Sequence, residues 1–224
     1  FLLGAGGLLL AGAVLGGAAS GARSSDPGPG SWDQAGVGET TGLLVADPYP
    51  ALIHETDNGL RTAFLASNGK LGVAGRLPKD LVGGAAVVRG TLIKRGERTM
   101  IALADAPDAI RPPSPGFTPP VRPKPEDMGE SLSDGEILDA KCWFGAMRPG
   151  WGKTHKSCAA LCARGGLPLA WCTAGACGVA TDAPLFLDVN GRPHAPAILP
   201  WVADPVLAKG RLWRVGDVTQ FRVA

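Results

Sequence analysis

The residues best suited to bind a metal ion or to carry out thiol chemistry lie close together in the second half of the chain. They are Cys142, His155, Cys158 and Cys162. Thr154 and Gly165 are typical of helix ends, so residues 155–164 are predicted to form a short helix that carries three of these side chains on one face. Glycines in the preceding loop let Cys142 fold over that face. Thiolate sulfur and imidazole nitrogen suit a closed tetrahedral site, so we predict a structural site for Zn(II) or Cu(I) at these four residues.

The same cysteines could instead form disulfides. Cys172 and Cys177 flank a short, flexible turn that can bring their Cα atoms within bridging distance, which predicts a disulfide between them. Cys142 could then pair with Cys158 or Cys162 and tie the helix to the preceding strand. The chain has five cysteines, so one stays unpaired, as a buried thiol, a reactive thiol or a metal ligand. The metal site, the disulfides and a catalytic thiol all remain open at this point.

The stretch around these residues has one resemblance. Residues 135–168, GEILDAKCWFGAMRPGWGKTHKSCAALCARGGLP, contain all four predicted metal ligands. This stretch resembles a segment of uncharacterised exported or membrane-anchored bacterial proteins. The resemblance implies that the segment is one unit, and it implies no activity.

No complete catalytic constellation accompanies the cysteines. The sequence GWGKT at 150–154 is similar to a phosphate-binding loop, but Met147 stands where that motif requires its first glycine. His54 and His194 lie far apart, without a nucleophile elbow. The chain also lacks a haem-attachment C-x-x-C-H sequence and a four-cysteine iron–sulfur pattern. We therefore predict no catalytic residues and favour a non-enzymatic role.

The elements that position these residues are predicted to be mainly β. The chain contains 33 glycines and 20 prolines, which favour short strands and turns over a helical bundle. The segments GTLIKRGERTMIALA (90–104) and GRLWRVGDVTQFRVA (210–224) match at a constant offset of 120 residues, which indicates an internal duplication of a strand–turn–strand unit. Each copy has the size of a small OB-type barrel or a compact sandwich. We predict two such domains, at 41–110 and 131–224, the second with a Cys/His-rich insertion at 141–178.

The remaining segments are predicted to be an anchor and two linkers. Residues 1–22 carry no charge and are long enough to cross a bilayer as a helix. Small residues four apart, as at Gly12 and Gly16, let such a helix pack closely against other transmembrane helices. The polar stretch at 23–40 and the proline-rich stretch at 111–130 are predicted to be linkers.

Charge and organisation together lead to a functional prediction. The net charge of +2 argues against a nucleic-acid partner. One N-terminal anchor followed by a cysteine-bearing body indicates a single-pass protein of the bacterial inner membrane, with periplasmic domains. We predict a non-catalytic accessory subunit of a respiratory or photosynthetic electron-transport complex, in contact with lipid and with other transmembrane helices. The alternative is a maturation factor that handles metal, haem or thiols for an exported redox protein, with the Cys/His segment as its active element.

Overall fold

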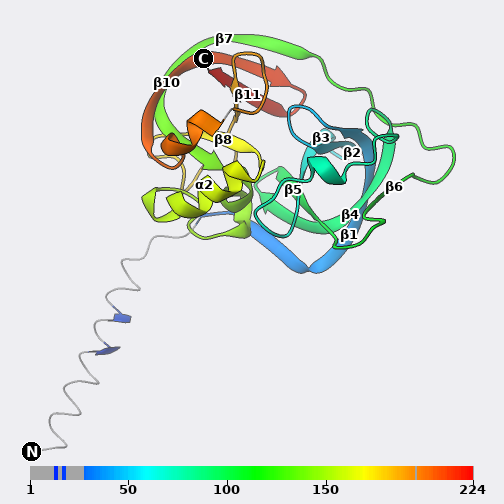
Figure 1. Cartoon of the computed structure of the whole chain (residues 1–224), viewed down its shortest axis with the longest axis horizontal. Helices are drawn as coiled ribbons and strands as arrows, with labels where there is room; N and C mark the ends of the chain where they lie inside the picture. The colour runs from blue at the N-terminus through cyan, green and yellow to red at the C-terminus, as the bar shows by residue number, and fades with distance from the viewer. Residues whose placement is uncertain (1–12, 15–16, 19–27, 195, 224) are drawn as a thin grey trace, which may run out of the picture.

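The computed structural model describes residues 13–14, 17–18, 28–194 and 196–223 and contains two closed five-stranded β-barrels (Figure 1). The strands of the first barrel are β1 (Ser31–Val45), β2 (Ala51–Thr56), β3 (Gly59–Ala66), β4 (Ala85–Arg95) and β5 (Arg98–Leu103). They follow the order β1-β2-β3-β5-β4, and pairing of β1 with β4 closes the barrel. A short strand, β6 (Ile110–Arg111), pairs with β4, and a single 3-10 turn, η1 (Ala74–Arg76), follows β3.

The second barrel repeats this strand order. Its strands are β7 (Pro125–Asp139), β8 (Leu169–Thr173), β9 (Leu185–Asp188), β10 (Pro205–Val215) and β11 (Val218–Val223). They close in the order β7-β8-β9-β11-β10, and in each barrel the third strand pairs with the fifth in parallel. Its connections contain a π-helical turn η2 (Cys142–Ala146), a 3-10 turn η3 (Lys153–His155), helix α2 (Lys156–Arg164) and a 3-10 segment η4 (Pro196–Trp201). The predicted mainly β fold is confirmed, and of barrel and sandwich the chain forms barrels.

The matched sequence segments form equivalent hairpins in the two barrels. The bounds of β4 and β5 become those of β10 and β11 at the same offset of 120 residues. Gly90 and Gly210 occupy equivalent positions, and a Cβ on either would collide with a carbonyl oxygen of the neighbouring strand. Gly96 and Gly216 open the two hairpin turns with φ of 56° and 61°, a conformation that favours glycine. The repeat in the sequence therefore marks positions that the hairpin geometry requires.

The two barrels pack against each other through a shared hydrophobic cluster. This cluster joins Ile53 and Phe64 of the first barrel to Leu138 and Leu187 of the second. Apolar side chains are driven into such a contact by removal of their surface from water. The two barrels are therefore held together by buried side chains as well as by the intervening segment of chain.

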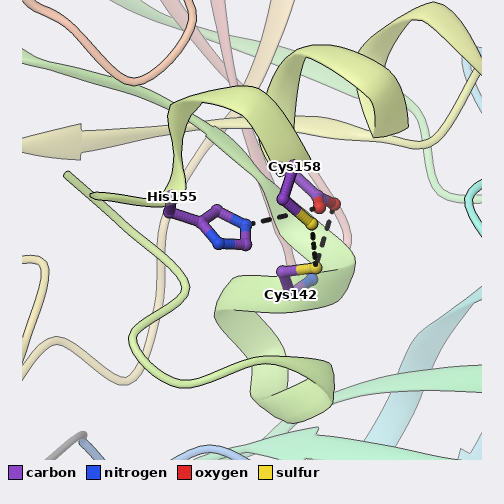
Figure 2. Close-up of side chains that lie close together, drawn as sticks. Cys142, His155 and Cys158 are labelled. Carbon is purple, nitrogen blue, oxygen red and sulfur yellow. Dashed lines mark hydrogen bonds and ion pairs between the residues drawn. The ribbon is translucent and has the colours of Figure 1, made fainter. Parts of the chain in front are cut away.

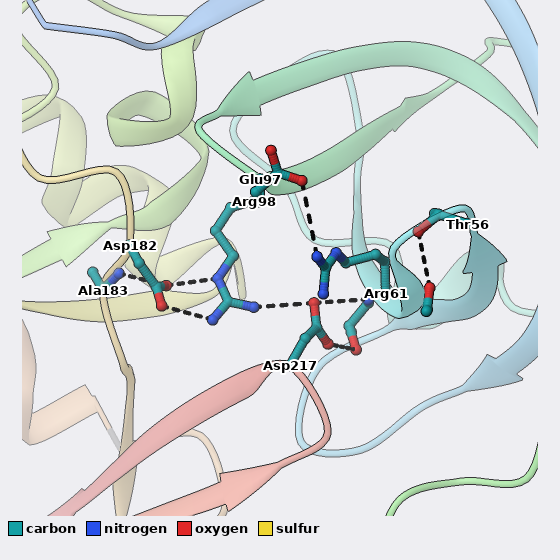
Figure 3. Close-up of polar contacts among 9 residues, drawn as sticks. Thr56, Arg61, Glu97, Arg98, Asp182, Ala183 and Asp217 are labelled. Atoms are coloured by element: carbon teal, nitrogen blue, oxygen red, sulfur yellow. Dashed lines mark hydrogen bonds and ion pairs between the residues drawn. The ribbon is translucent and has the colours of Figure 1, made fainter.

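Polar contacts at the hairpin turns add to this interface (Figure 3). The Asp217 carboxylate in the β10–β11 turn accepts hydrogen bonds from the Thr62 hydroxyl at 2.7 Å and from Arg98 at 3.1 Å. Arg98 also forms a two-pronged ion pair with Asp182, at 2.6 Å and 2.8 Å. Each barrel therefore presents its hairpin end to the other barrel.

Tyr49, the only tyrosine of the chain, lies in the same interface. Its ionisation is expected to destabilise the folded chain at alkaline pH. Its hydroxyl accepts a hydrogen bond from the Leu169 N–H at 3.4 Å, and burial raises its pKa to about 12. Because the unfolded chain ionises near the ordinary value of 10.0, the folded state loses stability between pH 10 and 12, by about 2 to 3 kcal/mol in total. Below pH 10 this contribution is fully present.

The ultraviolet absorbance of tyrosinate measures this ionisation directly, because the chain has no second tyrosine. We expect the absorbance of the folded chain to rise near pH 12, well above the pH at which the unfolded chain ionises, and we expect a Tyr49→Phe variant to lose the extra alkaline destabilisation. Ionisation of the folded chain near pH 10 would contradict the prediction.

Several sequence predictions about boundaries need correction. β1 begins at Ser31, inside the predicted linker 23–40, and β7 begins at Pro125, inside the predicted linker 111–130. Both stretches are rich in residues typical of loops, but long-range pairing with β4 and β10 makes them strands. The predicted insertion 141–178 is also interrupted, because the buried residues of β8 lie within it. The connection between β7 and β8 is residues 140–168, whereas the equivalent connection in the first barrel is residues 46–50.

The predicted anchor at 1–22 falls almost wholly outside the described residues, of which only 13–14 and 17–18, all helical, belong to it. Within the part of the chain that the structure covers, none of the helices combines the length and the apolar character needed to cross a bilayer. The anchor therefore stays a prediction.

Candidate metal centre

Four side chains with metal-binding atoms converge where the β7–β8 connection leaves the second barrel. They are Asp139, Cys142, His155 and Cys158. One ligand atom from each lies within 4.8 Å of the corresponding atoms of the other three. Figure 2 shows the thiols of Cys142 and Cys158 facing each other, with the imidazole of His155 beside them. Three of the four residues are buried and Cys158 is half-buried.

Local structure holds each of these side chains in place. Asp139 is the last residue of β7, and its Oδ1 accepts hydrogen bonds from the N–H groups of Lys141 at 3.0 Å and Cys142 at 3.4 Å. This turn starts η2, so the same carboxylate fixes the backbone of Cys142. His155 ends η3, and Cys158 lies in the first turn of α2. The four side chains therefore come from a strand end, two helical turns and a helix start that follow one another along the chain.

Two polar atoms at the centre of this group make no hydrogen bonds to the described residues. Asp139 Oδ2 and His155 Nε2 are buried, and neither has a hydrogen bond to any of the described residues. These two atoms are 3.9 Å apart, a long ion-pair contact that forms only when the imidazole is protonated. Leaving a buried polar atom unpaired costs about 1 to 3 kcal/mol. The pair therefore marks a place where a bound ion would relieve a cost to the fold.

The sulfur atoms of Cys142 and Cys158 form the opposite side of the group, 3.9 Å apart. With Zn–S distances of about 2.3 Å, two sulfur ligands of a tetrahedral ion lie about 3.8 Å apart. With Zn–N and Zn–O distances of about 2.0 to 2.1 Å, the nitrogen and oxygen ligands lie about 3.4 Å apart. The sulfur pair already has the required separation, and the Asp139–His155 pair needs to close by only about 0.5 Å.

The two sulfur atoms have different surroundings. The Lys70 ammonium donates a hydrogen bond to Cys158 Sγ at 2.6 Å, and this bond raises the pKa of Lys70. In contrast, a hydrogen bond with Cys162, then burial, then the charge of Asp139 raise the pKa of Cys142. Burial also lowers the pKa of Lys141. A metal ion would have to displace the Cys142 proton, because only thiolate is a ligand.

Three of the four predicted metal residues lie together in the structure. Cys142, His155 and Cys158 lie together, whereas Cys162 is buried beside Cys142 and outside the group of four. Asp139 takes the fourth place. The sequence contained one signal for it, because Asp139 precedes Cys142 by the same three residues by which His155 precedes Cys158.

The predicted helix has slightly different ends. α2 begins at Lys156 and ends at Arg164, and Thr154 makes no capping hydrogen bond at its start. The left-handed residue that ends the helix is Gly166, with φ of 84°, and not Gly165. These shifts leave His155 just before the helix, where its imidazole still lies against the thiols.

The predicted disulfide between Cys172 and Cys177 is confirmed, with a Cα–Cα distance of 5.6 Å. Cys142, Cys158 and Cys162 are free thiols, so the alternative bridges from Cys142 are not formed. The disulfide lies at the end of β8, and the Cys177 carbonyl accepts a hydrogen bond from the Trp143 indole at 2.9 Å. It therefore stabilises the segment that packs beside the metal group.

No protein-family model matches this chain, and comparisons with curated proteins and with solved structures also give no match. Inference about function therefore depends on the chemistry of the site. Four protein ligands complete a tetrahedral shell and leave no position for a water molecule or a substrate. The arrangement is suited to holding an ion and unsuited to activating water on it.

Proposed function

We propose that this chain is a non-catalytic accessory protein whose second barrel holds Zn(II) through Asp139, Cys142, His155 and Cys158. The observation that carries this proposal is the pair of buried atoms without hydrogen bonds, Asp139 Oδ2 and His155 Nε2, opposite two thiols. One ion would satisfy both atoms and both sulfurs. Since the ion would fix a strand end, a loop and a helix start to one another, its effect is on stability of the fold.

The donor set favours Zn(II) over Cu(I). Cu(I) is a soft ion that prefers thiolate and thioether sulfur, whereas Zn(II) accepts sulfur, imidazole nitrogen and carboxylate oxygen together. The group contains Asp139 and not Cys162, and a carboxylate ligand favours zinc over copper as the bound ion.

The disulfide supports a location on the exported side of a bacterial membrane. Structural disulfides such as Cys172–Cys177 persist in oxidising compartments. Two free thiols at 3.9 Å would be prone to oxidation there, and a bound zinc ion would protect them. The uncharged residues 1–22 would supply the anchor.

In this setting we propose that the protein covers the periplasmic face of a respiratory or photosynthetic complex, with its anchor among the transmembrane helices of that complex. The strand order of both barrels supports the OB type, a five-stranded barrel whose surface commonly serves for binding. Migration of the detergent-extracted chain as a monomer would contradict the subunit role and would leave the zinc site unaffected.

The alternative role, transfer of metal to an exported redox protein, is favoured by one observation. Cys158 is half-buried, so one ligand of the site is within reach of solvent. A transfer protein must release its ion to a partner while folded, whereas a structural site releases it mainly on unfolding. Release from the folded chain in the presence of a chelator separates the two roles.

Removal of zinc is expected to destabilise the purified chain. The full chain, extracted in mild detergent, should contain zinc in equimolar amount by elemental analysis. Chelation should lower the midpoint of thermal unfolding, because an ion at about 1,000 times its dissociation constant contributes about 4 kcal/mol. Readdition of zinc should restore the midpoint. A metal-free chain whose unfolding does not respond to added zinc would contradict the proposed function.

A further inference from the structure

A loop of the first barrel covers the metal group of the second. This loop, residues 67–72, follows β3 and is called loop 67–72 below. Its Lys70 ammonium contacts Cys158 Sγ, as described above, and its Gly72 N–H donates to the Gly165 carbonyl at 2.7 Å. Gly165 directly follows α2, the helix that carries Cys158. The loop is therefore attached to the metal-binding segment at two points.

A third attachment comes from Lys141, which lies between Asp139 and Cys142 in the sequence. Its ammonium is almost fully buried and donates to the carbonyls of Ser67, Asn68 and Gly69, at 2.6 Å, 2.9 Å and 2.7 Å. These three bonds use all three donors of the ammonium. The backbone of loop 67–72 is thus wrapped around a side chain that belongs to the metal-binding turn, and this fixes the direction in which Lys70 points.

The close fit between the loop and α2 depends on glycine. A Cβ on Gly165 would collide with the Lys70 carbonyl, and a Cβ on Gly72 would lie 2.6 Å from the Gly166 carbonyl oxygen. Real Cβ atoms do not approach a carbonyl oxygen so closely, so a side chain at either position would push the loop away from the helix. Glycines at positions 72 and 165 therefore allow the backbone of loop 67–72 to lie directly against the end of α2.

The charge of the site gives Lys70 a role. Zn(II) bound by two thiolates, one carboxylate and a neutral imidazole carries one negative charge in excess. Lys70 places a positive charge at the thiolate of Cys158, the one ligand of the four that is not fully buried. Loss of the ion from the folded chain would begin at this ligand, where water or a chelator can first reach the coordination shell.

We propose that Lys70 is a positioning residue for the zinc site, supplied by the first barrel, and that loop 67–72 controls release of the ion. The inference rests on the zinc site proposed above and adds its regulation. The Lys70 ammonium holds the Cys158 thiolate against displacement and shields it from solvent. The ion then leaves the folded protein only when loop 67–72 moves away from α2.

The rate of zinc release from the loaded full chain tests this proposal. An excess of a chromophoric chelator such as pyridylazoresorcinol captures each ion that leaves, and its absorbance gives the rate. We expect Lys70→Met to release zinc about tenfold faster than the unaltered chain, the low end of the effect of residues that support metal ligands. Lys70→Arg keeps a positive donor and should restore much of the slow release.

Lys79→Met is the matched control, because Lys79 is an exposed lysine of the same barrel and the change in net charge is identical. A rate for Lys70→Met equal to that of Lys79→Met, at full zinc content, would overturn the role of Lys70 and leave the zinc site standing. Failure of the unaltered chain to bind zinc would overturn both.

A second variant tests the loop itself. Gly72→Ala should displace loop 67–72 from α2 without changing any charge, and should also accelerate release. In the Gly72→Ala background, Lys70→Met should add little, because Lys70 would no longer reach Cys158. Independent, multiplying effects of the two substitutions would show that the loop does not act through Lys70. Circular dichroism of each variant verifies that the barrels remain folded.

Discussion

Replacement of Arg95 by methionine is expected to lower the free energy of unfolding by about 3 to 5 kcal/mol. Arg95 ends β4 in the first barrel, and only 1% of its surface is exposed. Its guanidinium donates to the carbonyls of Trp143, Cys177, Gly178 and Ala180, at distances of 2.8 Å, 2.9 Å, 3.1 Å and 2.7 Å. All four carbonyls belong to the second half of the chain, so this one side chain joins the two barrels.

The expected size of the effect follows from what methionine would leave behind. The buried carbonyl of Trp143 would lose its charged donor, which is costly, and the carbonyl of Cys177 would keep only its hydrogen bond from the Trp143 indole. The guanidinium also lies 4.1 Å from the centre of the Trp143 ring, a contact that methionine replaces only in part. Burial and the nearby Arg148 lower the pKa of Arg95, so the four carbonyls compensate a real cost of placing the charge there.

Denaturant unfolding, followed by tryptophan fluorescence, measures the change. Lys94→Met is the control, because Lys94 precedes Arg95 in the same strand and is exposed. We expect this control to change stability by less than about 0.5 kcal/mol. If Arg95→Met proved as mild as its control, the interface between the barrels would not depend on this side chain.

The second large effect concerns the identity of the fourth zinc ligand. Asp139→Asn is expected to weaken zinc binding by at least ~100-fold, since loss of a direct ligand exceeds the 10- to 100-fold effects of outer-shell residues. Asparagine keeps an oxygen that can accept from the Lys141 and Cys142 N–H groups, so the turn itself is preserved. Cys162→Ser is expected to change the affinity only a few-fold, because Cys162 lies outside the group of four.

Competition with a chelator of known affinity measures both variants. The reverse result, with zinc lost in Cys162→Ser and retained in Asp139→Asn, would support the ligand set predicted from the sequence. Loss in both variants would indicate that the Cys162 contact with Cys142 is needed to position that thiol. The two substitutions therefore show whether Asp139 or Cys162 binds the ion directly.

The barrels could be predicted from the sequence only as far as local patterns extend. The Gly-containing turns at Gly96 and Gly216 and the alternation around them indicated two equivalent hairpins, and the structure contains them. Closure of a barrel, however, depends on pairs such as Ser31 with Lys94, which are distant in the sequence. Glycine and proline in the outer parts of β1 and β7 resemble linker composition, so these strand ends could not be recognised without their partners.

The candidate metal group could also be predicted only where it depends on residues close together in the sequence. The spacing of His155 and Cys158 indicated that these side chains lie together, as they do in the structure, and the short Cys172–Cys177 turn allowed the disulfide to be identified. Asp139 was missed because a carboxylate at a strand end is usually exposed, and here it is fully buried. Lys70 could not be foreseen, because it comes from the other barrel and reaches the site only through packing of the two barrels.

The unequal connections described for the two barrels carry a consequence for how this architecture can change. Residues 46–50 and residues 140–168 join equivalent strands, yet only the longer segment bears members of the candidate metal group, namely Cys142, His155 and Cys158, while Asp139 ends the strand before it. Lengthening one loop between strands can thus add a binding site to a barrel while the hydrogen bonds between its strands stay unchanged. A transplant of the longer segment between the first two strands of another barrel of this kind would bring three candidate ligands, but it would still need an aspartate at the end of the preceding strand and a lysine from a neighbouring barrel.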